Sequence, residues 1–309
     1  MKQFVVTGAS GYIGSHMCYE LRQAYPDCKI IAIDKVKKHK LNHLYDDIFV
    51  MDLSKSNFHI FNRYKPDCIF HFASLASVPE GEENPYLYYN NNIVSSTKLI
   101  DEALFYGVKN FIFSSSCAVY GSVNGFINES VTKNPQSVYA HTKSIVEDIL
   151  LAAEKEGIRV GILRYFNAAG RNVEAGLYEE HEPETHLLPN IMKSDTIKIY
   201  GNDYNTPDGT AVRDYIHVVD ICQAHIRAYE YMEQNDKGII CNLGTGKGHS
   251  VLDIVNQVRD LTGKQIDVEY HGRRNGDVDR LVSDVGRMLG VLTFTPKHDI
   301  KSIINSLMV

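Results

Sequence analysis

The sequence predicts an α/β protein: a doubly wound parallel sheet followed by a smaller α/β domain. Three observations support this fold class. Short apolar runs alternate with longer segments of helical period up to about residue 165. A glycine-rich turn joins the first apolar run to the first helical segment. This alternation ends after Asn167. Continuous apolar strands that alternate with helices are typical of a parallel sheet covered on both faces.

The expected strands of the first domain are short and rich in β-branched and aromatic residues. They lie at Gln3–Thr7, Lys29–Asp34, Ile48–Met51, Asp67–Ala73, Asn110–Ser114 and Arg159–Leu163. Helices are expected from about Ile13 to Ala24, over about 84–106 and over about 137–156. Strands separated by helices in this way predict parallel crossover units.

The elements after Asn167 are shorter. They are strands at Ile197–Tyr200 and Tyr215–Val219 and a helix near 251–262. The polar segment 171–186 has little strand signal and predicts a surface connection over a cleft. We therefore predict two domains, 1–170 and 171–309, with residues 215–243 returning to the first.

The composition is typical of a folded protein with a substantial core. The 309 residues are 44% hydrophobic and 23% charged, and the net charge of -6 suggests no nucleic-acid surface. No apolar run of about 18 residues occurs, and the N-terminus enters a strand directly, so we expect neither a membrane span nor a signal peptide and predict a cytoplasmic location. The six cysteines form no CxxC pair and predict buried reduced thiols, and the histidines lack metal-ligand spacing, so no metal is expected.

The glycine turn reads Gly8-Ala9-Ser10-Gly11-Tyr12-Ile13-Gly14, a GxxGxxG spacing. Glycines here permit a tight turn and let backbone N–H groups approach a pyrophosphate at a helix N-terminus. Because the turn follows a strand and opens a helix, it predicts a Rossmann-type dinucleotide-binding domain.

Asp34 ends the second expected strand, about 20 residues after Gly14. A carboxylate at this place accepts hydrogen bonds from the adenosine ribose hydroxyls and repels a 2′-phosphate, which favours NAD over NADP. Lys35 and Lys37 are nearby cations that could tolerate a phosphate, and the plain structural alternative for Asp34 is a turn cap.

The stretch Ser137–Lys143 (SVYAHTK) places Tyr139 and Lys143 one helical turn apart, on one face. A free tyrosine titrates near pH 10, and a lysine beside it would lower that pKa toward the range useful for removing a proton from an alcohol. The alternative is a solvated helix with a chance pair. Three serines, Ser114–Ser116, follow the fifth strand, either as donors to a ligand at the strand end or as a polar turn.

These motifs together resemble the extended short-chain dehydrogenase/reductase family and, within it, the UDP-glucose/UDP-galactose 4-epimerase pattern. The resemblance runs nearly from end to end. It is carried further by Arg164–Asn167 (RYFN), Gly201–Tyr204, Asp208–Thr210, Val212–Val218, Asn242–Gly244, Ser250–Asp253 and Arg273–Asp277.

The resemblance implies NAD as cofactor, a UDP-sugar as substrate, and a catalytic group of Ser116, Tyr139 and Lys143. Tyr139 would remove the proton of the sugar 4-hydroxyl, Ser116 would share that hydrogen-bond network, and Lys143 would lower the tyrosine pKa and bind the nicotinamide ribose. Implied NAD contacts beyond the glycine turn and Asp34 are Asp52, Leu53, Phe72, Ala73, Asn91, Ser114, Tyr165 and Phe166. Implied UDP-sugar contacts beyond the catalytic group are Asn167, Leu187, Tyr200, Arg213, Val251, Arg274, Asp277 and Leu281.

The sequence departs from the family pattern at a few positions. Ala76 stands where the best-known bacterial epimerases carry a lysine, His186 stands where they have asparagine, and Leu281 stands where glucose/galactose-restricted members resemble one another in having tyrosine. A smaller residue there leaves room for an N-acetyl group, although Leu281 could equally be a core residue. The chain also ends soon after Ile304, without the longer tail of those enzymes.

Three other functions remain open. UDP-glucuronate or UDP-pentose 4-epimerases share the pattern. A nucleotide-sugar 4,6-dehydratase would need an Asp-Glu pair where Cys117 and Ala118 stand, and a non-catalytic NAD-sensing protein commonly lacks the tyrosine or the lysine. The resemblance also implies a homodimer formed through the helices near 84–106 and 137–156.

Overall fold

The computed structural model describes residues 1–55, 60–180, 186–274 and 276–308. Residues 181–185 of the polar connection and Asn275 of the Arg273–Asp277 motif lie outside the described residues. The chain divides into two compact units. The first comprises Met1–Val119, Pro135–Arg164 and Cys222–Cys241, and the second comprises Tyr120–Asn134, Tyr165–Ile221 and Asn242–Val309. Residues 120–134 are a part of the second unit that no sequence pattern singled out.

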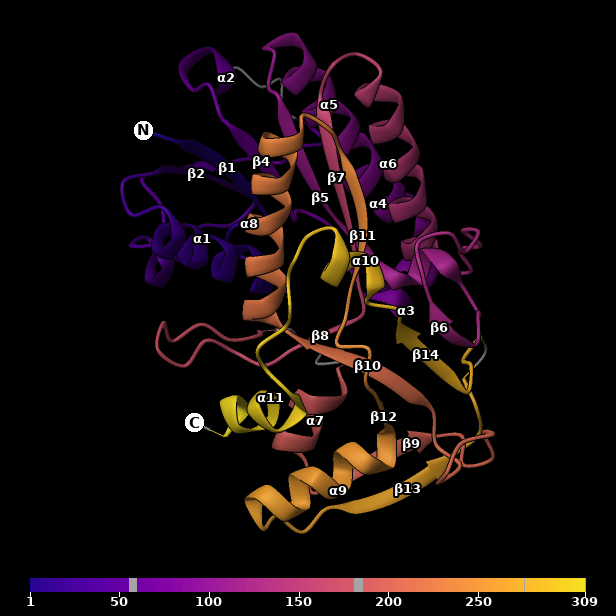
Figure 1. The fold of residues 1–309 in the computed structure, drawn as a ribbon. Coiled ribbons are helices and arrows are strands. Elements are labelled where there is room, and N and C mark those ends of the chain that lie inside the picture. Colours follow the sequence, from indigo (N-terminus) through magenta and orange to yellow (C-terminus); the bar gives the residue numbers. More distant parts are fainter. Residues whose placement is uncertain (56–59, 181–185, 275, 309) are drawn as a thin grey trace. The chain divides into compact units, whose positions relative to one another are not determined.

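The first unit is built on a sheet whose seven described strands follow the order β11-β7-β5-β4-β1-β2-β3 (Figure 1). The strands are β1 (Gln3–Thr7), β2 (Lys29–Asp34), β3 (Asp47–Val50), β4 (Cys68–His71), β5 (Asn110–Ser116), β7 (Arg159–Tyr165) and β11 (Ile239–Leu243). The pairs β1–β2, β1–β4, β2–β3 and β4–β5 are parallel. The chain order reverses between β1 and β4, which confirms the doubly wound sheet and marks where such folds bind ligands.

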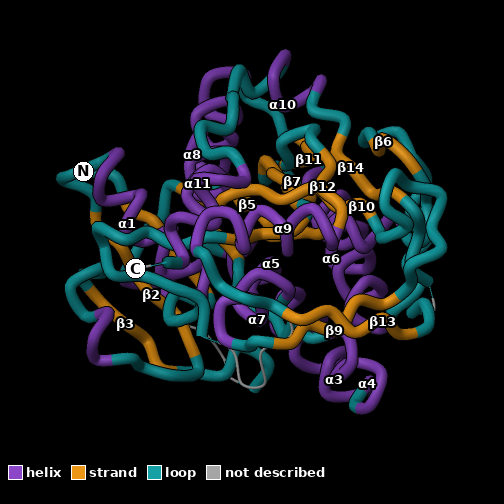
Figure 2. The backbone as a smooth tube through the Cα atoms, turned by 90° about the horizontal axis from the view of Figure 1, so that it is seen from below, coloured by secondary structure: helices purple, strands orange, loops and turns teal. Residues whose placement is uncertain are grey.

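Helices cover both faces of this sheet. Figure 2 shows β5 between α8 (Val218–Asn235) on one side and α5 (Ser95–Phe105) on the other. Helix α6 (Val138–Glu154) packs against α5 and β5, and α1 (Tyr12–Ala24) packs against β1. The shorter helical segments are η1 (His39–Leu41), α2 (Ile60–Arg63), α3 (Val78–Glu83), α4 (Pro85–Tyr88) and η3 (Cys117–Tyr120).

The helix expected over about 84–106 is interrupted. Helix α4 leads into a π-helix, η2 (Tyr89–Val94), and α5 follows it. The hydroxyls of Ser95, Ser96 and Thr97 donate to the carbonyl oxygens four residues earlier, at positions 91–93. Such bonds compete with regular helix bonds and often bend a helix. Asn91 and Asn92 are buried in this segment.

Other elements differ from expectation mainly at their ends. Strands β5 and β7 run on to Ser116 and Tyr165, whereas β4 ends earlier, at His71. The strand expected at Tyr215–Val219 is β10 (Val212–His217), and the residues after it form α8, a helix that no sequence pattern had indicated. Residues 35–40 are mostly exposed.

The second unit contains two sheets. The larger has the order β12-β10-β14-β6, with β8 also paired to β10, and β9 and β13 form a separate parallel pair, side by side in Figure 2. The strands are β6 (Gly125–Ile127), β8 (Asn167–Ala169), β9 (Thr196–Tyr200), β10, β12 (Gly248–Ser250), β13 (Asp267–His271) and β14 (Arg280–Ser283). The helices are α7 (Leu187–Lys193), α9 (Val251–Thr262), α10 (Gly286–Gly290) and α11 (Ile300–Leu307).

Each unit has its own hydrophobic core. In the first, strand residues such as Val5, Ile31 and Phe111 pack against helix residues such as Leu99 and Leu150. In the second, β9 packs with α7, α9 and α11. All six cysteines are free, and five are buried. Within the described residues, no helix is both long enough and apolar enough to cross a membrane.

Candidate active site

The glycine turn of the first unit packs backbone against backbone so closely that side chains would clash there. A Cβ on Gly14 would lie 2.1 Å from the carbonyl oxygen of Gly8, and a Cβ on Gly8 would lie 2.8 Å from the backbone nitrogen of Ala73. Helix α1 starts at Tyr12 with Gly11 as its N-cap, and no side chain caps it. Uncapped N–H groups and the helix dipole favour a diphosphate at this point. The turn therefore fits a dinucleotide.

Asp34 has a structural role at the end of β2. Its Oδ2 accepts a hydrogen bond from the N–H of Ser10 at 2.9 Å, and its Oδ1 accepts one from the N–H of Val36 at 3.1 Å. Asp34 is therefore a turn cap that holds the glycine turn in place. Its carboxylate is only partly buried, and each oxygen has a second lone pair that a ribose hydroxyl can use. The two interpretations of Asp34 are compatible.

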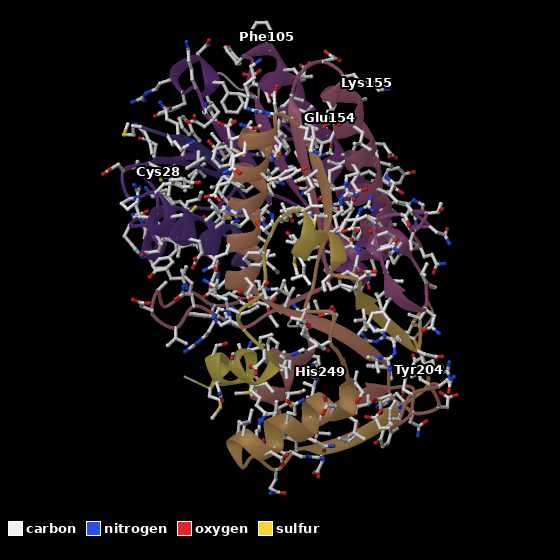
Figure 3. All side chains as sticks on the ribbon, in the orientation of Figure 1. Cys28, Phe105, Glu154, Lys155, Tyr204 and His249 are labelled. Atoms are coloured by element: carbon white, nitrogen blue, oxygen red, sulfur yellow. The ribbon has the colours of Figure 1, made fainter. Side chains whose placement is uncertain are left out.

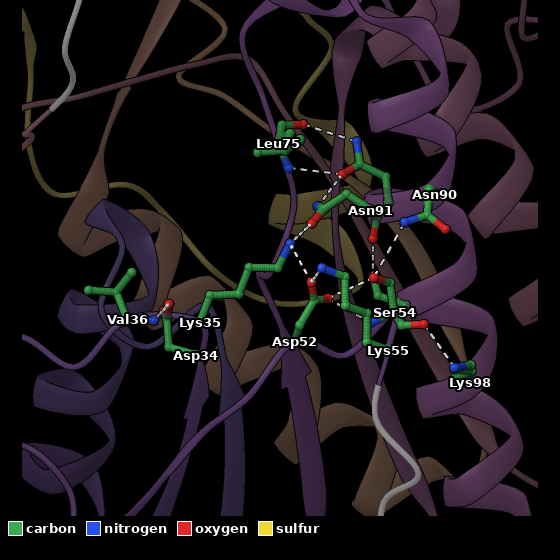
Figure 4. A network of polar contacts seen from close by, with 12 residues as sticks. Asp34, Lys35, Val36, Asp52, Ser54, Lys55, Leu75, Asn90, Asn91 and Lys98 are labelled. Carbon is green, nitrogen blue, oxygen red and sulfur yellow. Dashed lines mark hydrogen bonds and ion pairs between the residues drawn. The ribbon is translucent and has the colours of Figure 1, made fainter.

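Lys35 joins a polar network between β2, the loop after β3 and the π-helix (Figure 4). Its Nζ contacts the Asn91 side-chain oxygen and lies 3.4 Å from Asp52 Oδ2. Asp52 in turn accepts hydrogen bonds from the backbone and hydroxyl of Ser54 at 3.0 and 2.7 Å. The Lys35 charge is thus directed to a carboxylate of the same unit. Leu53, beside Asp52, is buried in the core.

A buried hydrogen-bond chain through His71 joins the strand end beside the glycine turn to helix α5. Ser96 donates to the carbonyl oxygen of Asn92 at 2.6 Å, so it accepts from His71 Nε2, 2.8 Å away. His71 Nδ1 then accepts from the Thr7 hydroxyl at 2.6 Å, and Thr7 accepts from the N–H of Ala73 at 3.2 Å. Burial, aided by the charge of Lys143, lowers the pKa of His71 to about 3, so the ring is neutral.

The sequence by itself did not predict this chain of hydrogen bonds. The available signal was a histidine at the end of an otherwise apolar strand. These hydrogen bonds hold Ala73 beside Gly8. The ring centre of the neighbouring Phe72 lies 4.9 Å from that of His225.

Asn92 connects the loop after β4 to the helix that carries Tyr139. Its Oδ1 accepts from the N–H of Leu75 at 2.8 Å, and its Nδ2 donates to the carbonyl oxygen of Leu75 and to Thr142 Oγ1, both at 3.0 Å. Thr142 donates to the carbonyl oxygen of Tyr139 at 2.7 Å. Asn92 therefore positions the first turn of α6.

The three serines at the end of β5 each contact a different turn of α6. Helix α6 begins after Ser137, whose hydroxyl accepts from the N–H of Ala140 at 3.2 Å. The Ser116 hydroxyl hydrogen-bonds Tyr139, the carbonyl oxygen of Ser114 accepts from Lys143 Nζ at 2.8 Å, and the Ser115 hydroxyl donates to Glu147 Oε1 at 2.5 Å. These α6 residues lie on one helical face because they are one turn apart.

The expectation that Lys143 lowers the pKa of Tyr139 is not met in this structure. Burial raises the pKa of Tyr139 to about 12, and the Ser116 hydrogen bond opposes this only in part. Burial also lowers the pKa of Lys143 to about 7. The Lys143 nitrogen lies over the tyrosine ring, 5.6 Å from its centre, and bonds to a backbone oxygen. Burial is therefore the main cause of both pKa shifts.

The second unit places four of the expected substrate residues around β10. Arg213 bonds Asp277 Oδ1 through Nη2 at 2.9 Å, and its Nη1 donates to the carbonyl oxygens of Val212 and Val278, also at 2.9 Å. Leu281 on β14 pairs with Arg213 in the sheet register. Asn167 on β8 donates to the carbonyl oxygen of Asp214 at 2.8 Å.

Two expected residues of this unit stack on each other. The Arg274 guanidinium lies over the Tyr200 ring, 4.0 Å from its centre, at the end of β9. Nearby, Arg273 lies 4.1 Å from the centre of the Tyr204 ring and pairs with Asp203 at 2.7 Å. The Tyr204 side chain is labelled in Figure 3. Guanidinium groups that are held flat by aromatic rings are pre-organised for phosphate or carboxylate oxygens.

The remaining expected residues occupy the edges of this unit. Leu187 and Val251 are the first residues of α7 and α9, and both pack on the core of the second unit. Phe166 donates its N–H to the carbonyl oxygen of Leu243 at 3.1 Å, and Tyr165 is the last residue of β7. His186, which replaces the family asparagine, pairs with Glu179 at 2.7 Å. Among the described residues, no cluster of His, Cys, Asp or Glu could hold a metal ion.

Known proteins are similar to this chain in sequence and in fold. Residues 4–244 match the NAD dependent epimerase/dehydratase family. The UDP-glucose 4-epimerase of Lactobacillus helveticus is 38% identical, covering 97% of this chain and 93% of its own.

Two solved structures cover nearly the full length. The UDP-glucose 4-epimerase from Brucella ovis in complex with NAD is 36% identical, with a TM-score of 0.92 over 99% of this chain and 97% of that one. The UDP-Glc/GlcNAc 4-epimerase from Campylobacter jejuni is 33% identical, with a TM-score of 0.84 over 100% and 99%. The family match over residues 4–244 and the relatives that cover nearly the whole chain show that this chain belongs to the NAD dependent epimerase/dehydratase family.

Proposed function

We propose that this protein interconverts the C4 epimers of a UDP-hexose, with NAD as a retained cofactor. The observation that carries the proposal is the Ser116, Tyr139 and Lys143 cluster at the carboxyl end of β5, in the same unit as the glycine turn. The curated UDP-glucose 4-epimerases that cover nearly the whole chain support it.

Each residue of the cluster has a separate task. Tyr139 takes the proton of the sugar 4-hydroxyl and returns it, Ser116 hydrogen-bonds the same oxygen, and Lys143 supplies positive charge beside the phenol. When bound, NAD supplies the hydride acceptor for C4 and a positive charge in its oxidised form. Since the Tyr139 pKa is about 12 in the protein alone, the phenol starts as an acid and needs such added charge to act as a base.

The second unit supplies the charges that a UDP group needs. Arg213 and Arg274 suit the diphosphate because guanidinium groups form bidentate, charge-assisted hydrogen bonds. Arg213 is already bonded to Asp277, so a diphosphate would share or replace that contact. Tyr200 has an aromatic face on which uracil can stack. Many contacts to UDP and few to the hexose would let the 4-keto sugar rotate in the site and present its other face to the cofactor.

The protein should purify with NAD(H) bound and should turn over without added cofactor. An epimerase returns the hydride in each cycle, so release of the cofactor is unnecessary. The measurement is the cofactor content after denaturation, with NAD and NADP quantified separately. Bound NADP would contradict the selectivity argued from Asp34, and stoichiometric release of NADH with product would contradict epimerisation.

Leu281→Tyr should suppress the N-acetylhexosamine reaction more than the glucose/galactose reaction. We infer that Leu281, paired with Arg213 in the sheet, leaves room for the C2 substituent and permits both substrate types. The dual UDP-Glc/GlcNAc name of the Campylobacter jejuni relative supports this breadth. The test is kcat/KM for both UDP-sugars, because their ratio reports differential transition-state binding.

Leu281→Met is the matched control, since it keeps the size without adding a ring. If Leu281→Tyr leaves the ratio of the two kcat/KM values unchanged, Leu281 does not determine which C2 substituent the site accepts.

A homodimer and a cytoplasmic location remain proposals from the family resemblance. Exposed apolar side chains on helices near the expected interface support the first: Tyr86 and Leu87 on α4 and Ile145 on α6. Their contact with a second copy would remove them from water.

A further inference from the structure

A buried ion pair lies one turn beyond Lys143 on helix α6. The Glu147 side chain is 0% exposed and that of Arg164, on β7, is 5% exposed. Arg164 Nε donates to Glu147 Oε1 at 2.9 Å, and Nη2 donates to Oε2 at 2.6 Å, a bidentate arrangement. The Ser115 hydroxyl donates to Oε1 as well, at 2.5 Å. The carboxylate is therefore held by two neighbouring strands.

This pair is not explained by stability alone. Burying two charges is expensive, and well-packed apolar residues of similar volume often stabilise a core as well or better. Glu147 has no place among the residues that the family resemblance assigns to substrate or cofactor. Its position relative to Lys143 points to a role, because the two share a helical face and the same strand end.

The charge of Glu147 acts on Lys143. Burial lowers the pKa of the Lys143 ammonium to about 7, and the negative charge of Glu147 opposes that fall. Glu147 lies one helical turn from Lys143, whereas its partner Arg164 lies on β7. In this ion pair the carboxylate therefore lies on the same helix as Lys143, and the guanidinium lies on the neighbouring strand.

We propose that Glu147 is a positioning residue that favours the charged form of Lys143, with Ser115 and Arg164 holding its carboxylate in place. The three serines then have distinct tasks: Ser116 contacts Tyr139, Ser114 accepts from Lys143, and Ser115 holds Glu147. This inference rests on the proposed role of Lys143 in the epimerase, and it adds a residue that acts through Lys143 without touching substrate.

Other ionisable groups face Lys143 less directly. On its own helix Tyr139 has a pKa raised by burial, and on β4 His71 is neutral for the same reason. The charges on the helices packed against α6 are engaged elsewhere or exposed. Glu82 of α3 accepts from the N–H of Val138 and Lys98 of α5 donates to the carbonyl oxygen of Ser54, while Asp101 is exposed. Glu147 is the carboxylate that acts on the lysine.

The test titrates Lys143 directly in the full-length protein as purified. Lysine labelled with ¹³C at Cε gives an NMR signal that follows protonation, and Lys143→Arg assigns it. In Glu147→Gln the midpoint should fall by about one pH unit, the order of shift that a nearby opposite charge causes. The alkaline limb of the kcat profile should move down with it. Glu147→Asp keeps the charge and should restore most of the shift.

Two matched variants separate charge from packing. Asp148→Asn removes an exposed carboxylate from the next position of the same helix, and Ser115→Ala perturbs the Glu147 site without removing its charge. Asp148→Asn should leave the Lys143 midpoint near that of the natural protein, and Ser115→Ala should lower it less than Glu147→Gln does. If Glu147→Gln does not fold, the double variant with Arg164→Gln leaves no unpaired buried charge and should show a smaller fall in the same direction.

The outcomes distinguish this inference from the proposed function. A Lys143 midpoint that moves no further in Glu147→Gln, or in the double variant, than in Asp148→Asn would overturn it, even in an active epimerase. A shifted midpoint in a protein that epimerises no UDP-hexose would uphold the coupling and refute the proposed function instead.

Discussion

Tyr139→Phe should lower turnover by about 10²–10⁴-fold and leave the fold and the bound cofactor unchanged. The phenyl ring keeps the packing against the Lys143 side chain, whose nitrogen lies 5.6 Å from the ring centre. Only the hydroxyl that moves the proton is lost, together with its hydrogen bond to Ser116. Because the substitution acts on the chemical step, kcat should fall much more than KM changes.

The measurement is kcat and KM for UDP-galactose, with the cofactor content and the melting temperature determined on the same preparation. Tyr89→Phe is a suitable control, since Tyr89 is an exposed tyrosine of the π-helix. The control should retain full activity. Turnover by Tyr139→Phe at the level of the natural protein would remove Tyr139 from the mechanism.

Gly14→Ala should abolish cofactor retention and, with it, activity without added NAD. An added Cβ would lie 2.1 Å from the Gly8 carbonyl oxygen and 2.7 Å from its carbonyl carbon, which is far inside contact distance. Both are backbone atoms, so no side-chain rotation can relieve the clash, and the glycine turn must move. The start of α1 would then lose the geometry that suits a diphosphate.

Gly290→Ala is the matched control, because a Cβ there would meet no atom within 4 Å. Both variants should be compared for bound NAD(H) after denaturation, for melting temperature and for epimerase activity with and without NAD. A Gly14→Ala protein that retains a full complement of NAD would show that the cofactor does not lie on this turn.

Much of the first unit could be read from local patterns. Strands β1 and β2 begin and end where the sequence predicts, and α6 begins after Ser137, because apolar runs, the glycine turn and an N-cap serine act over a few residues. The pairing of Tyr139 and Lys143 on one face follows from helix geometry alone. Helix α8 and the π-helix were missed, because they depend on packing and on serine side-chain bonds.

The electrostatic state of the site was beyond sequence reasoning. The sequence places a lysine beside a tyrosine and so predicts a lowered phenol pKa, but burial raises it to about 12. The ion pair of Glu147 with Arg164 and the chain through His71 join residues from different strands and helices. The residues next to Glu147, Arg164 and His71 in the sequence do not indicate which side chains these three contact.

The sequence by itself determined the fold class, the family, the dinucleotide turn and the identities of Ser116, Tyr139 and Lys143. These depend on residue types at short, regular spacings, where backbone geometry decides what can meet. The tertiary structure alone decided which buried polar groups became partners and which protonation state each prefers. The physical reason is that desolvation and hydrogen bonding in a low-dielectric interior depend on the neighbours that packing assembles from distant parts of the chain.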